Sequence, residues 1–407
     1  MRILLHDYAG HPFQVELSRA LAGRGHDVRH LYSASIQTPR GQLIRRPDDA
    51  ETFSIAGIEL KRVISKYRFV QRFQLESKYG KLLVDECKRF DPDVVMSANT
   101  PSLVQVQLAR WCRARDVRLV SWIQDCYGLA AYRILSRKLP GLGHAVGRYM
   151  MALDRESALA SDAVIVVTDD FIPYFERNRV SKSRLHVIQN WAPLELLPLA
   201  AKNNDWAIAH QLDPAKVRFL YSGTLSVRHD ADLLVQLGVR LQEWGNGELV
   251  VVSEGPAIEA VKKRAEELGL DSVRCFPFQP FEQMSLVLGC ADVLVSILDR
   301  DAGVYCVPSK VLSYMCAGRA QLVAMPLENL AARIVQQNGI GAVSRPEHVS
   351  HFLENAHALF LDKDRRNACG KAARAFAETH FRLDEICSRF ERILGVGKES
   401  TQFAAVG

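Results

Sequence analysis

The stretch that decides the fold class reads RILLHDYAGHPFQVELSRALAGRGHDVRHLY over residues 2–32. Arg2–Leu5 is a short apolar run typical of a buried strand, Val15–Leu21 has helical spacing, and Val28–Tyr32 opens a second strand. Two glycines between them lie where they would end the helix. A strand, a helix and a second strand within about 32 residues form one βαβ unit, which predicts a parallel sheet covered by helices.

The same alternation of strands and helices continues along the chain with one interruption. Residues 191–205 contain prolines and have no clean period, which predicts a linker. The sequence therefore predicts two successive α/β domains, over residues 1–190 and 206–378, each with a parallel sheet. A final helix in 379–407 exceeds what the second domain needs, and we expect it to pack back against the first. Further strands are predicted at 93–97, 119–124, 163–168, 185–188, 219–223, 249–253, 273–277, 293–297, 321–324 and 341–344.

Length and composition exclude several classes of protein. The chain has 407 residues, 48% of them hydrophobic and 24% charged, which is typical of globular domains and excludes disorder and coiled coil. No apolar run approaches the roughly 20 residues that a membrane-spanning helix needs, and the amino terminus turns polar too soon for a secretory signal. Nine cysteines without a Cys-x-x-Cys pair indicate reduced, cytoplasmic thiols, and no zinc site is expected.

Positive charge is concentrated in the first half of the chain. Residues 1–200 carry a net charge of +8 and residues 201–407 a net charge of −2. Residues 101–150 hold eight basic and two acidic side chains, and apolar residues interleave with the basic ones in the later part. This pattern indicates a segment lying on an anionic membrane surface rather than a nucleic-acid interface. A solvated basic face without any partner remains the alternative.

In open parallel sheets, ligands bind outside the carboxyl ends of the strands, and two such domains would form a cleft between them. In the second domain, Gly223 ends a predicted strand and allows a ligand to approach the backbone. Arg228 and His229 follow it before the next helix, in position to meet an anion. Ser309 and Lys310 begin another predicted helix and are suited to phosphate. An ordinary turn and a surface N-cap with a solvated lysine are the alternatives.

The first domain offers a second set of polar strand ends. In the first strand-to-helix loop, the Gly10 amide is placed to meet a diphosphate, and Tyr8, His11 and Phe13 are expected to line an acceptor pocket. Asn99 follows another strand. Asp125 follows the strand after that, where its carboxylate could hydrogen-bond sugar hydroxyls or assist an attacking one. A plain helix N-cap is an equally good interpretation of Asp125.

Several enzyme signatures are missing from the sequence. It contains no Gly-x-Gly-x-x-Gly, no Gly-x-x-x-x-Gly-Lys-Ser/Thr and no Gly-x-Ser-x-Gly. A dinucleotide-dependent oxidoreductase, a P-loop nucleotide hydrolase and an α/β-hydrolase are therefore not favoured.

Over nearly its full length the chain resembles the family 4 retaining glycosyltransferases of the GT-B fold, in the branch of bacterial exopolysaccharide and O-antigen transferases similar to colanic acid and fucosamine transferases. The order and spacing of the landmarks carry the resemblance. They are Arg24-Gly25-His26, Gln124-Asp125, Ala163–Thr168, His186–Trp191, Ser222-Gly223-Thr224, Glu254-Gly255-Pro256 and Val307–Gly318.

The resemblance implies an acceptor-binding first domain, a second domain that binds a nucleotide sugar, usually with UDP or GDP, and a last helix that crosses back to the first domain. It implies that Lys310 and a basic residue after Gly223 hold the donor diphosphate, so that no metal and no further cofactor are expected. Asp125, Arg228 and Lys310 are the predicted catalytic residues. The predicted donor-binding residues are Gly223, Thr224, His229, Glu254, Phe278, Asp301, Ser309, Val311 and Ser313.

The sequence departs from the family pattern at two glutamates that the family often carries eight positions apart. Those positions hold Tyr305 and Ser313. Ser313 is left to contact the ribose, and Asp301 or Asp299 to take the role of the first acid.

The family's usual arginine beside the donor-loop glycine is Thr224 here, which leaves Arg228 or His229 to supply the charge. The family's cleft histidine is replaced by the Gln124-Asp125 pair.

These features together predict transfer of a sugar from a nucleotide sugar, with UDP favoured, to a polyprenyl-diphosphate-linked saccharide in surface polysaccharide synthesis. Retention at the anomeric carbon follows from the resemblance. The enzyme is expected in the cytoplasm, peripheral on the inner face of the cytoplasmic membrane. Another GT-B nucleotide-sugar enzyme such as an epimerase, and a non-enzymatic sugar- or nucleotide-binding protein, are the alternatives.

Overall fold

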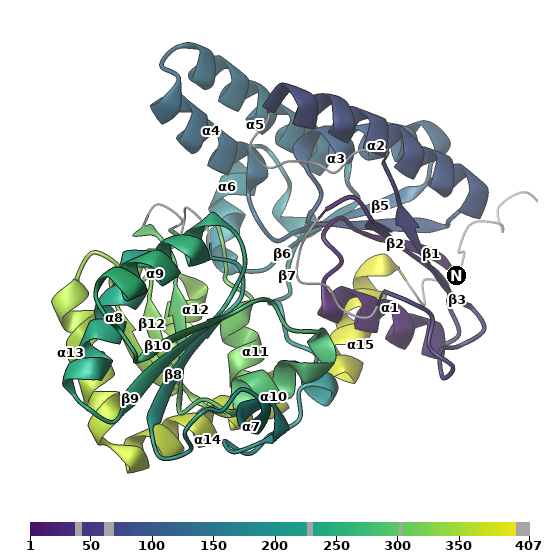
Figure 1. Ribbon diagram of the computed structural model, residues 1–407. Coiled ribbons are helices and arrows are strands. Elements are labelled where there is room, and N and C mark those ends of the chain that lie inside the picture. Colours follow the sequence, from purple (N-terminus) through teal and green to yellow (C-terminus); the bar gives the residue numbers. More distant parts are fainter. Residues whose placement is uncertain (37–42, 61–68, 226–230, 301–302, 396–407) are drawn as a thin grey trace, which may run out of the picture. The chain divides into compact units, whose positions relative to one another are not determined.

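The computed structural model describes residues 1–36, 43–60, 69–225, 231–300 and 303–395. These residues form two compact units (Figure 1). The first unit holds Met1–Gln189 and the chain from Leu383 on, and the second holds Asn190–Arg382. The sequence placed the corresponding divisions at residues 190 and 379. The segment 191–205, expected as a linker, belongs to the second unit.

The first unit is built on seven parallel strands in the order β3-β2-β1-β4-β5-β6-β7. The strands are β1 Arg2–Asp7, β2 Asp27–Ser33, β3 Phe53–Ile58, β4 Val94–Ala98, β5 Arg118–Ile123, β6 Ala163–Val166 and β7 Leu185–Val187. The helices are α1 Pro12–Gly23, α2 Phe69–Phe90, α3 Ser102–Arg115, α4 Tyr127–Lys138, α5 Leu142–Ala160, α6 Ile172–Arg177 and α15 Leu383–Leu394, with 3₁₀ turns at Asp169–Phe171 and Lys182–Arg184. The edge strand β3 was not predicted from the sequence.

The second unit has six parallel strands in the order β10-β9-β8-β11-β12-β13. The strands are β8 Val217–Ser222, β9 Gly247–Val252, β10 Val273–Phe276, β11 Val293–Ile297, β12 Ala320–Ala324 and β13 Gly341–Ser344. The helices are α7 Asp205–Ala209, α8 Ala231–Glu243, α9 Pro256–Glu267, α10 Met284–Gly289, α11 Lys310–Cys316, α12 Leu330–Gln337, α13 Val349–Leu361 and α14 Lys363–His380, with 3₁₀ turns at Leu194–Leu196 and Phe281–Gln283. Two Rossmann-like units confirm the predicted α/β fold class.

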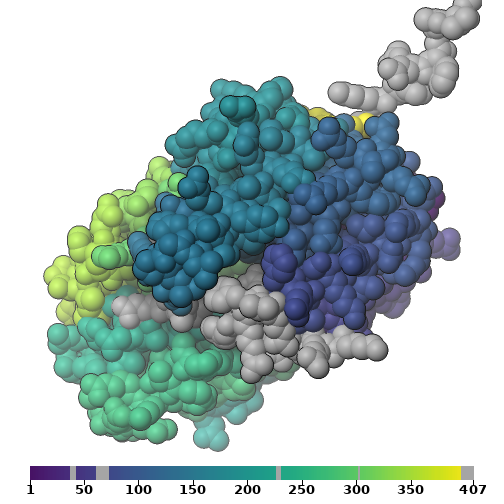
Figure 2. All heavy atoms as spheres, turned by 90° about the horizontal axis from the view of Figure 1, so that it is seen from above, coloured from purple at the N-terminus to yellow at the C-terminus, as the bar shows by residue number. Residues whose placement is uncertain are grey.

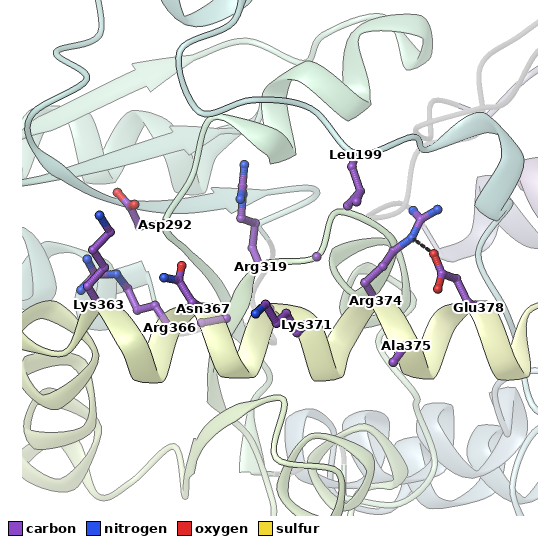
Figure 3. A pocket seen from close by; sticks show the side chains of 13 residues that line it. Leu199, Asp292, Arg319, Lys363, Arg366, Asn367, Lys371, Arg374, Ala375 and Glu378 are labelled. Carbon is purple, nitrogen blue, oxygen red and sulfur yellow. Dashed lines mark hydrogen bonds and ion pairs between the residues drawn. The ribbon is translucent and has the colours of Figure 1, made fainter.

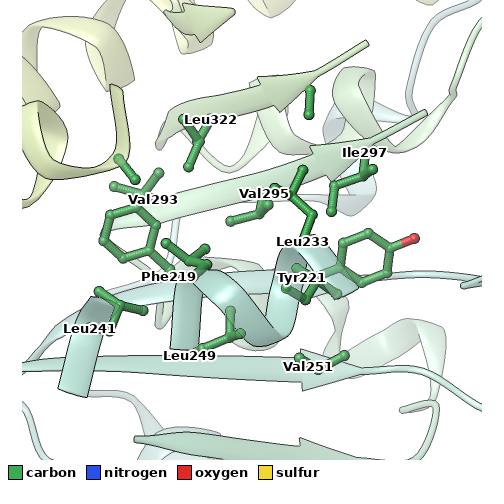
Figure 4. Packing of buried hydrophobic residues seen from close by; sticks show 14 of the residues in the cluster. Phe219, Tyr221, Leu233, Leu241, Leu249, Val251, Val293, Val295, Ile297 and Leu322 are labelled. Carbon is green, nitrogen blue, oxygen red and sulfur yellow. The ribbon is translucent and has the colours of Figure 1, made fainter. Parts of the chain in front are cut away.

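The second sheet is buried on both faces, as its continuous apolar strands predict. On β8, Phe219 and Tyr221 pack into the cluster on one face, whereas Leu220 between them packs into the cluster on the other. Figure 4 shows the ring of Tyr221 at the end of the first cluster, with its hydroxyl pointing away from the apolar side chains. Strand β8 therefore ends with a polar group directed out of the core.

Each sheet has one place where the chain reverses its order of adding strands. In the first sheet it lies between β1 and β4, and in the second between β8 and β11. Connections on the two sides of such a point leave the sheet in opposite directions, which opens a crevice at the carboxyl ends of these strands. The loops after β1, β4, β8 and β11 are therefore the places to search for ligand-binding residues.

Helix α15 packs onto the first unit, which confirms the predicted return of the last helix. Phe390 is fully buried and its ring centre lies 4.8 Å from that of Trp122 on β5. At the surface, Glu391 accepts a hydrogen bond from Arg24 Nη1 at 2.7 Å and lies 3.1 Å from His26 Nε2. Apolar packing supplies most of the stability of this contact, because exposed ion pairs contribute little.

The described helices include none that is both long and apolar enough to cross a bilayer. All nine cysteines are free thiols.

Replacing Phe390 by alanine removes a buried ring from the contact between α15 and β5. We expect Phe390→Ala to lower the free energy of unfolding of the first unit by about 3–5 kcal/mol. Urea unfolding followed by tryptophan fluorescence measures the change. The exposed neighbour Arg392 is the control, because Arg392→Ala should change stability by less than about 0.5 kcal/mol. Equal effects of the two substitutions would contradict the packing described above.

Candidate active site

In the second unit, the end of β8 comes into contact with the first residue of α11. Gly223 follows β8 with a φ of +132°, a conformation that side-chain-bearing residues rarely adopt. A Cβ atom built on Gly223 would lie 3.3 Å from Lys310 Cε and 3.4 Å from Lys310 Nζ. The absence of a side chain at position 223 therefore leaves room for the lysine beside the backbone.

The ammonium group of Lys310 rests on the tyrosine that precedes this turn. Its Nζ lies 3.9 Å from the ring centre of Tyr221 and donates a hydrogen bond to the Tyr221 hydroxyl, which in turn donates to the carbonyl of Thr224 at 3.0 Å. The contact of a cation with an aromatic face is attractive. Within the described residues, Lys310 forms no ion pair with a carboxylate.

Burial lowers the pKa of Lys310 to about 7, because it disfavours the charged form, and Cys306 opposes this shift only in part. The site therefore holds a cation that is close to its titration point at neutral pH. A phosphate placed beside it would restore the charge and bind to it. This property fits the role predicted for Lys310.

Helix α11 is fixed to β8 by a residue that sequence reasoning missed. The Tyr314 hydroxyl accepts a hydrogen bond from the Ser222 amide at 2.9 Å and donates one to the Ser222 carbonyl at 3.0 Å. Both main-chain groups at the end of β8 thereby bind a side chain of α11. Tyr314 thus helps to fix the helix that begins with Lys310.

The other predicted residues of α11 differ in their exposure. Ser309 precedes the helix and is exposed, with no capping hydrogen bond from its side chain. Ser313 is half-buried, whereas Val311 is fully buried in the core. The side chain of Val311 therefore packs in the core. Only the backbone of Val311 could make the predicted contact with a donor.

The loop after β9 presents the exposed carboxylate of Glu254. Its Oε1 accepts a hydrogen bond from the amide of Phe278, two residues after the end of β10, at 3.3 Å. The structure therefore brings two predicted donor residues, Glu254 and Phe278, into contact. Arg228, His229 and Asp301 lie outside the described residues, and their roles stay predictions.

In the first unit, the loop after β1 is organised by Asp7, a buried carboxylate that the sequence analysis did not single out. Asp7 accepts hydrogen bonds from the amides of Ala9, at 3.0 Å, and His11, and it lies 3.4 Å from His11 Nδ1. Gly10 takes a φ of +79° between them, which permits this tight turn. The position of Asp7 at the end of a predicted strand could have identified it from the sequence.

The charge of His11 is set by two carboxylates. Burial alone would lower the pKa of His11, but Asp7 and, to a smaller extent, Asp125 raise it above its ordinary value. Because Asp125 follows β5, the structure brings the ends of β1 and β5 together around this imidazole. Phe13 is buried and packs against both Trp122 and the ring of His11, so its place in an acceptor pocket stays a prediction.

Asn99, after β4, joins the same group of loops. It takes a φ of +51°, and the Tyr127 hydroxyl donates to its carbonyl at 3.3 Å and to its side-chain Oδ1. Tyr127 begins α4, two residues after Asp125. This contact ties the loop after β4 to the loop after β5, and sequence spacing could not reveal it.

A buried histidine lies directly beneath these loops. Burial lowers the pKa of His6 to about 3, so the ring is neutral. Its Nε2 lies 2.9 Å from Tyr79 Oη, and its Nδ1 lies 3.2 Å from Ser97 Oγ and 3.1 Å from Thr100 Oγ1. His6 is therefore a structural residue. Among the described residues, no group of three or more His, Cys, Asp or Glu could hold a metal ion.

Comparison with known proteins shows similarity to glycosyltransferases. Residues 11–191 match the family model of the Glycosyl transferase 4-like domain. A putative colanic acid biosynthesis glycosyl transferase of Escherichia coli K12, WcaI, is 22% identical over 307 residues, which cover 74% of each chain.

Solved structures show the fold at lower identity. Sucrose-phosphate synthase of Thermosynechococcus elongatus superposes with a TM-score of 0.74 at 14% identity, covering 97% of this chain and 98% of that one. HepE of Anabaena, solved with UDP and glucose, gives 0.70 at 14% identity over 97% and 99%. WaaG, a glycosyltransferase involved in lipopolysaccharide biosynthesis, gives 0.69 at 16% identity over 98% and 100%. Residues 11–191 are therefore similar to the Glycosyl transferase 4-like domain, and the chain as a whole has the GT-B fold of these structures.

Proposed function

We propose that the chain transfers a sugar from a nucleotide sugar, with UDP favoured as the nucleotide, to a polyprenyl-diphosphate-linked saccharide in surface polysaccharide synthesis. The contact of Lys310 with Tyr221 and Gly223 is the observation that carries the proposal. The relatives support the direction of this assignment, since HepE was solved with UDP-glucose and WcaI is named for colanic acid biosynthesis.

The chemistry proposed for the second unit is stabilisation of the leaving group. When the bond between the anomeric carbon and the diphosphate breaks, the diphosphate oxygen keeps the bonding electrons and gains negative charge. The ammonium of Lys310 would meet this charge from a poorly solvated position, where an ion pair is stronger than in water. Arg228 or His229 would add a second positive charge, and no metal ion would be needed. Retention at the anomeric carbon rests on the family resemblance.

The first unit is proposed to bind the acceptor. The imidazole of His11 lies beside the buried carboxylate of Asp7 and within the electrostatic influence of Asp125, which follows β5 at the same edge of the sheet. As a hydrogen-bond acceptor, Asp125 would orient the hydroxyl that attacks the anomeric carbon. The Gly10 amide remains the proposed contact of the acceptor diphosphate.

We also propose that the first unit lies on an anionic membrane through the α4–α5 hairpin. Two glycines let these helices pack closely, since a Cβ on Gly147 would lie 2.5 Å from Tyr132 Cα and one on Gly143 2.0 Å from the Leu135 carbonyl oxygen. The hairpin forms part of the surface in Figure 2. Its exposed apolar residues are Ile134, Leu139, Leu142, Val146 and Tyr149, and the basic residues between positions 133 and 149 are Arg133, Arg137, Lys138 and Arg148. Apolar side chains among basic ones suit the interface of an anionic bilayer.

Product formation tests the transferase directly. Purified protein is incubated with UDP-, GDP-, ADP- and dTDP-sugars and a polyprenyl-diphosphate-linked saccharide, and both the nucleotide and the glycosylated lipid are measured. We expect Lys310→Met to lower kcat/KM about 10²–10³-fold, the usual cost of losing one charge-stabilising group. Asp125→Asn should lower kcat at least about tenfold.

The matched controls are Lys263→Met and Asp48→Asn, which remove exposed charges from the second and first units without touching the site. Both should keep full activity. Donor turnover that needs no acceptor would overturn the transferase assignment in favour of an epimerase. Binding of nucleotide sugars with no turnover would indicate a binding protein, and full activity of Lys310→Met would remove that lysine from the site.

The affinity for a nucleoside diphosphate should fall as the pH rises above 7. In the free protein Lys310 has a pKa of about 7, and the bound diphosphate favours its charged form. Above pH 7 binding must therefore take up a proton, so the affinity for UDP should fall by up to about tenfold per pH unit between pH 7 and 9. Titration calorimetry in buffers of different ionisation enthalpy measures the proton. Lys310→Arg, which keeps its charge, should lose this pH dependence, and an unchanged slope would contradict the assignment.

Membrane association is measured by sedimentation with phosphatidylglycerol-containing vesicles. The double variant Leu142→Ser, Tyr149→Ser should bind at least about tenfold more weakly, because it removes two apolar side chains from the interface. Leu361→Ser is the control, since Leu361 in the second unit is 67% exposed, as is Leu142. Equal binding to vesicles of pure phosphatidylcholine, or equal loss in the control, would overturn the proposal.

A further inference from the structure

A polar pocket lies at the edge of the second sheet opposite to the proposed donor site. It has a volume of about 450 Å³ and is bordered by Asp292 before β11, by Gly318 and Arg319 before β12, and by one side of α14 (Figure 3). In a parallel sheet all strands begin at one edge and end at the other, so this pocket lies at the edge away from Gly223. None of the residues assigned to the donor site lines it.

The positive charge of this pocket exceeds its negative charge. Five basic and two acidic side chains line it. Both acidic groups already have a cationic partner, because Glu378 pairs with Arg374 at 2.7 Å and Asp292 with Lys202 at 2.6 Å. The remaining lining cations therefore form no ion pair with a carboxylate among the described residues.

Three of these cations are directed along the pocket. Lys363, Arg366 and Lys371 recur at intervals that place them on one side of α14, as Figure 3 shows. Lys363 and Lys371 are exposed, whereas Arg366 uses its Nη1 to bind the carbonyls of Leu359 and Phe360. The two lysines are thus free to meet a ligand, and the arginine adds charge from a fixed position.

Arg319 supplies a half-buried cation opposite the helix. Its Nε and Nη2 donate to the carbonyls of Gly289 and Ala200, at 3.2 and 2.8 Å. These bonds hold the guanidinium in one orientation, and no hydrogen bond of the described residues uses Nη1. A guanidinium that is held in one orientation, with Nη1 available as a hydrogen-bond donor, is suited to bind a phosphate oxygen.

The base of the pocket is closed by direct contact between backbones. A Cβ on Gly370 of α14 would lie 2.4 Å from the Gly318 carbonyl oxygen, so only glycine allows this approach. Gly318 itself has a φ of +63°. Helix α14 and the residues before β12 therefore pack directly against each other at the base of the pocket.

We propose that this pocket binds a small phosphorylated molecule, with its phosphate between Arg319, Lys363 and Lys371. The volume is within the range of about 300–1,000 Å³ that small-molecule sites occupy. Asn367, which is exposed on the same side of α14, offers an amide to the hydroxyls of a sugar phosphate. This site is separate from the proposed transfer reaction and does not depend on it.

Calorimetric titration of the full chain with glucose 6-phosphate and with pyrophosphate, at physiological ionic strength, tests the proposal. Saturable binding of either probe is expected, and it should be at least about tenfold weaker in Lys371→Glu and in the milder variant Lys371→Met. Lys263→Glu is the matched control, because it makes the same change in charge at an exposed position of α9 and should bind like the unaltered protein.

The donor-site variant Lys310→Met separates this pocket from the donor site. It should leave the affinity for glucose 6-phosphate unchanged, and excess UDP should not displace this probe. Tighter binding of glucose 6-phosphate than of pyrophosphate would support recognition of a sugar phosphate. The absence of saturable binding, equal weakening in Lys263→Glu, or loss of binding in Lys310→Met would each overturn the proposal.

Discussion

The second unit depends on holding an ammonium group against the end of a buried strand. A lysine beside the backbone of β8 loses water, and its pKa falls to about 7 as a result. The aromatic face of Tyr221 offsets part of that cost, and Gly223 leaves the space that the lysine occupies. The same desolvation that makes the free cation costly strengthens its attraction to an anion.

In the first unit, the buried charge of Asp7 has partners within the fold, in contrast to that of Lys310. Asp7 is satisfied within the fold by two backbone amides and by His11, whose pKa rises beside two carboxylates. A group with a partner of opposite charge keeps its charge when it is buried, whereas one without such a partner tends to lose it. This difference supports the proposal that Lys310 binds an external anion.

Periodicity was enough to predict the two parallel sheets, because their strands are continuous apolar runs. It missed β3, an edge strand that is only partly buried and whose residues form no such run. Glycine and lysine at strand and helix ends pointed to Gly223 and Lys310. The roles of Tyr314 and Tyr127 could not be predicted, because Tyr314 contacts a residue 92 positions away and Tyr127 one 28 positions away. A contact of that kind depends on the order of strands in the sheet, which local sequence does not specify.

Helix α11 is held by hydrogen bonds at both edges of the second sheet. Its first residue is Lys310, and the carbonyl of its last residue, Cys316, accepts a hydrogen bond from Arg374 of α14 at 2.8 Å. Tyr314 fixes the same helix to β8. A helix of seven residues that is held at both ends cannot shift without breaking one of these bonds. The position of the ammonium beside Gly223 therefore depends on packing at the far edge, where Arg374 and Gly370 bring α14 against the start of β12.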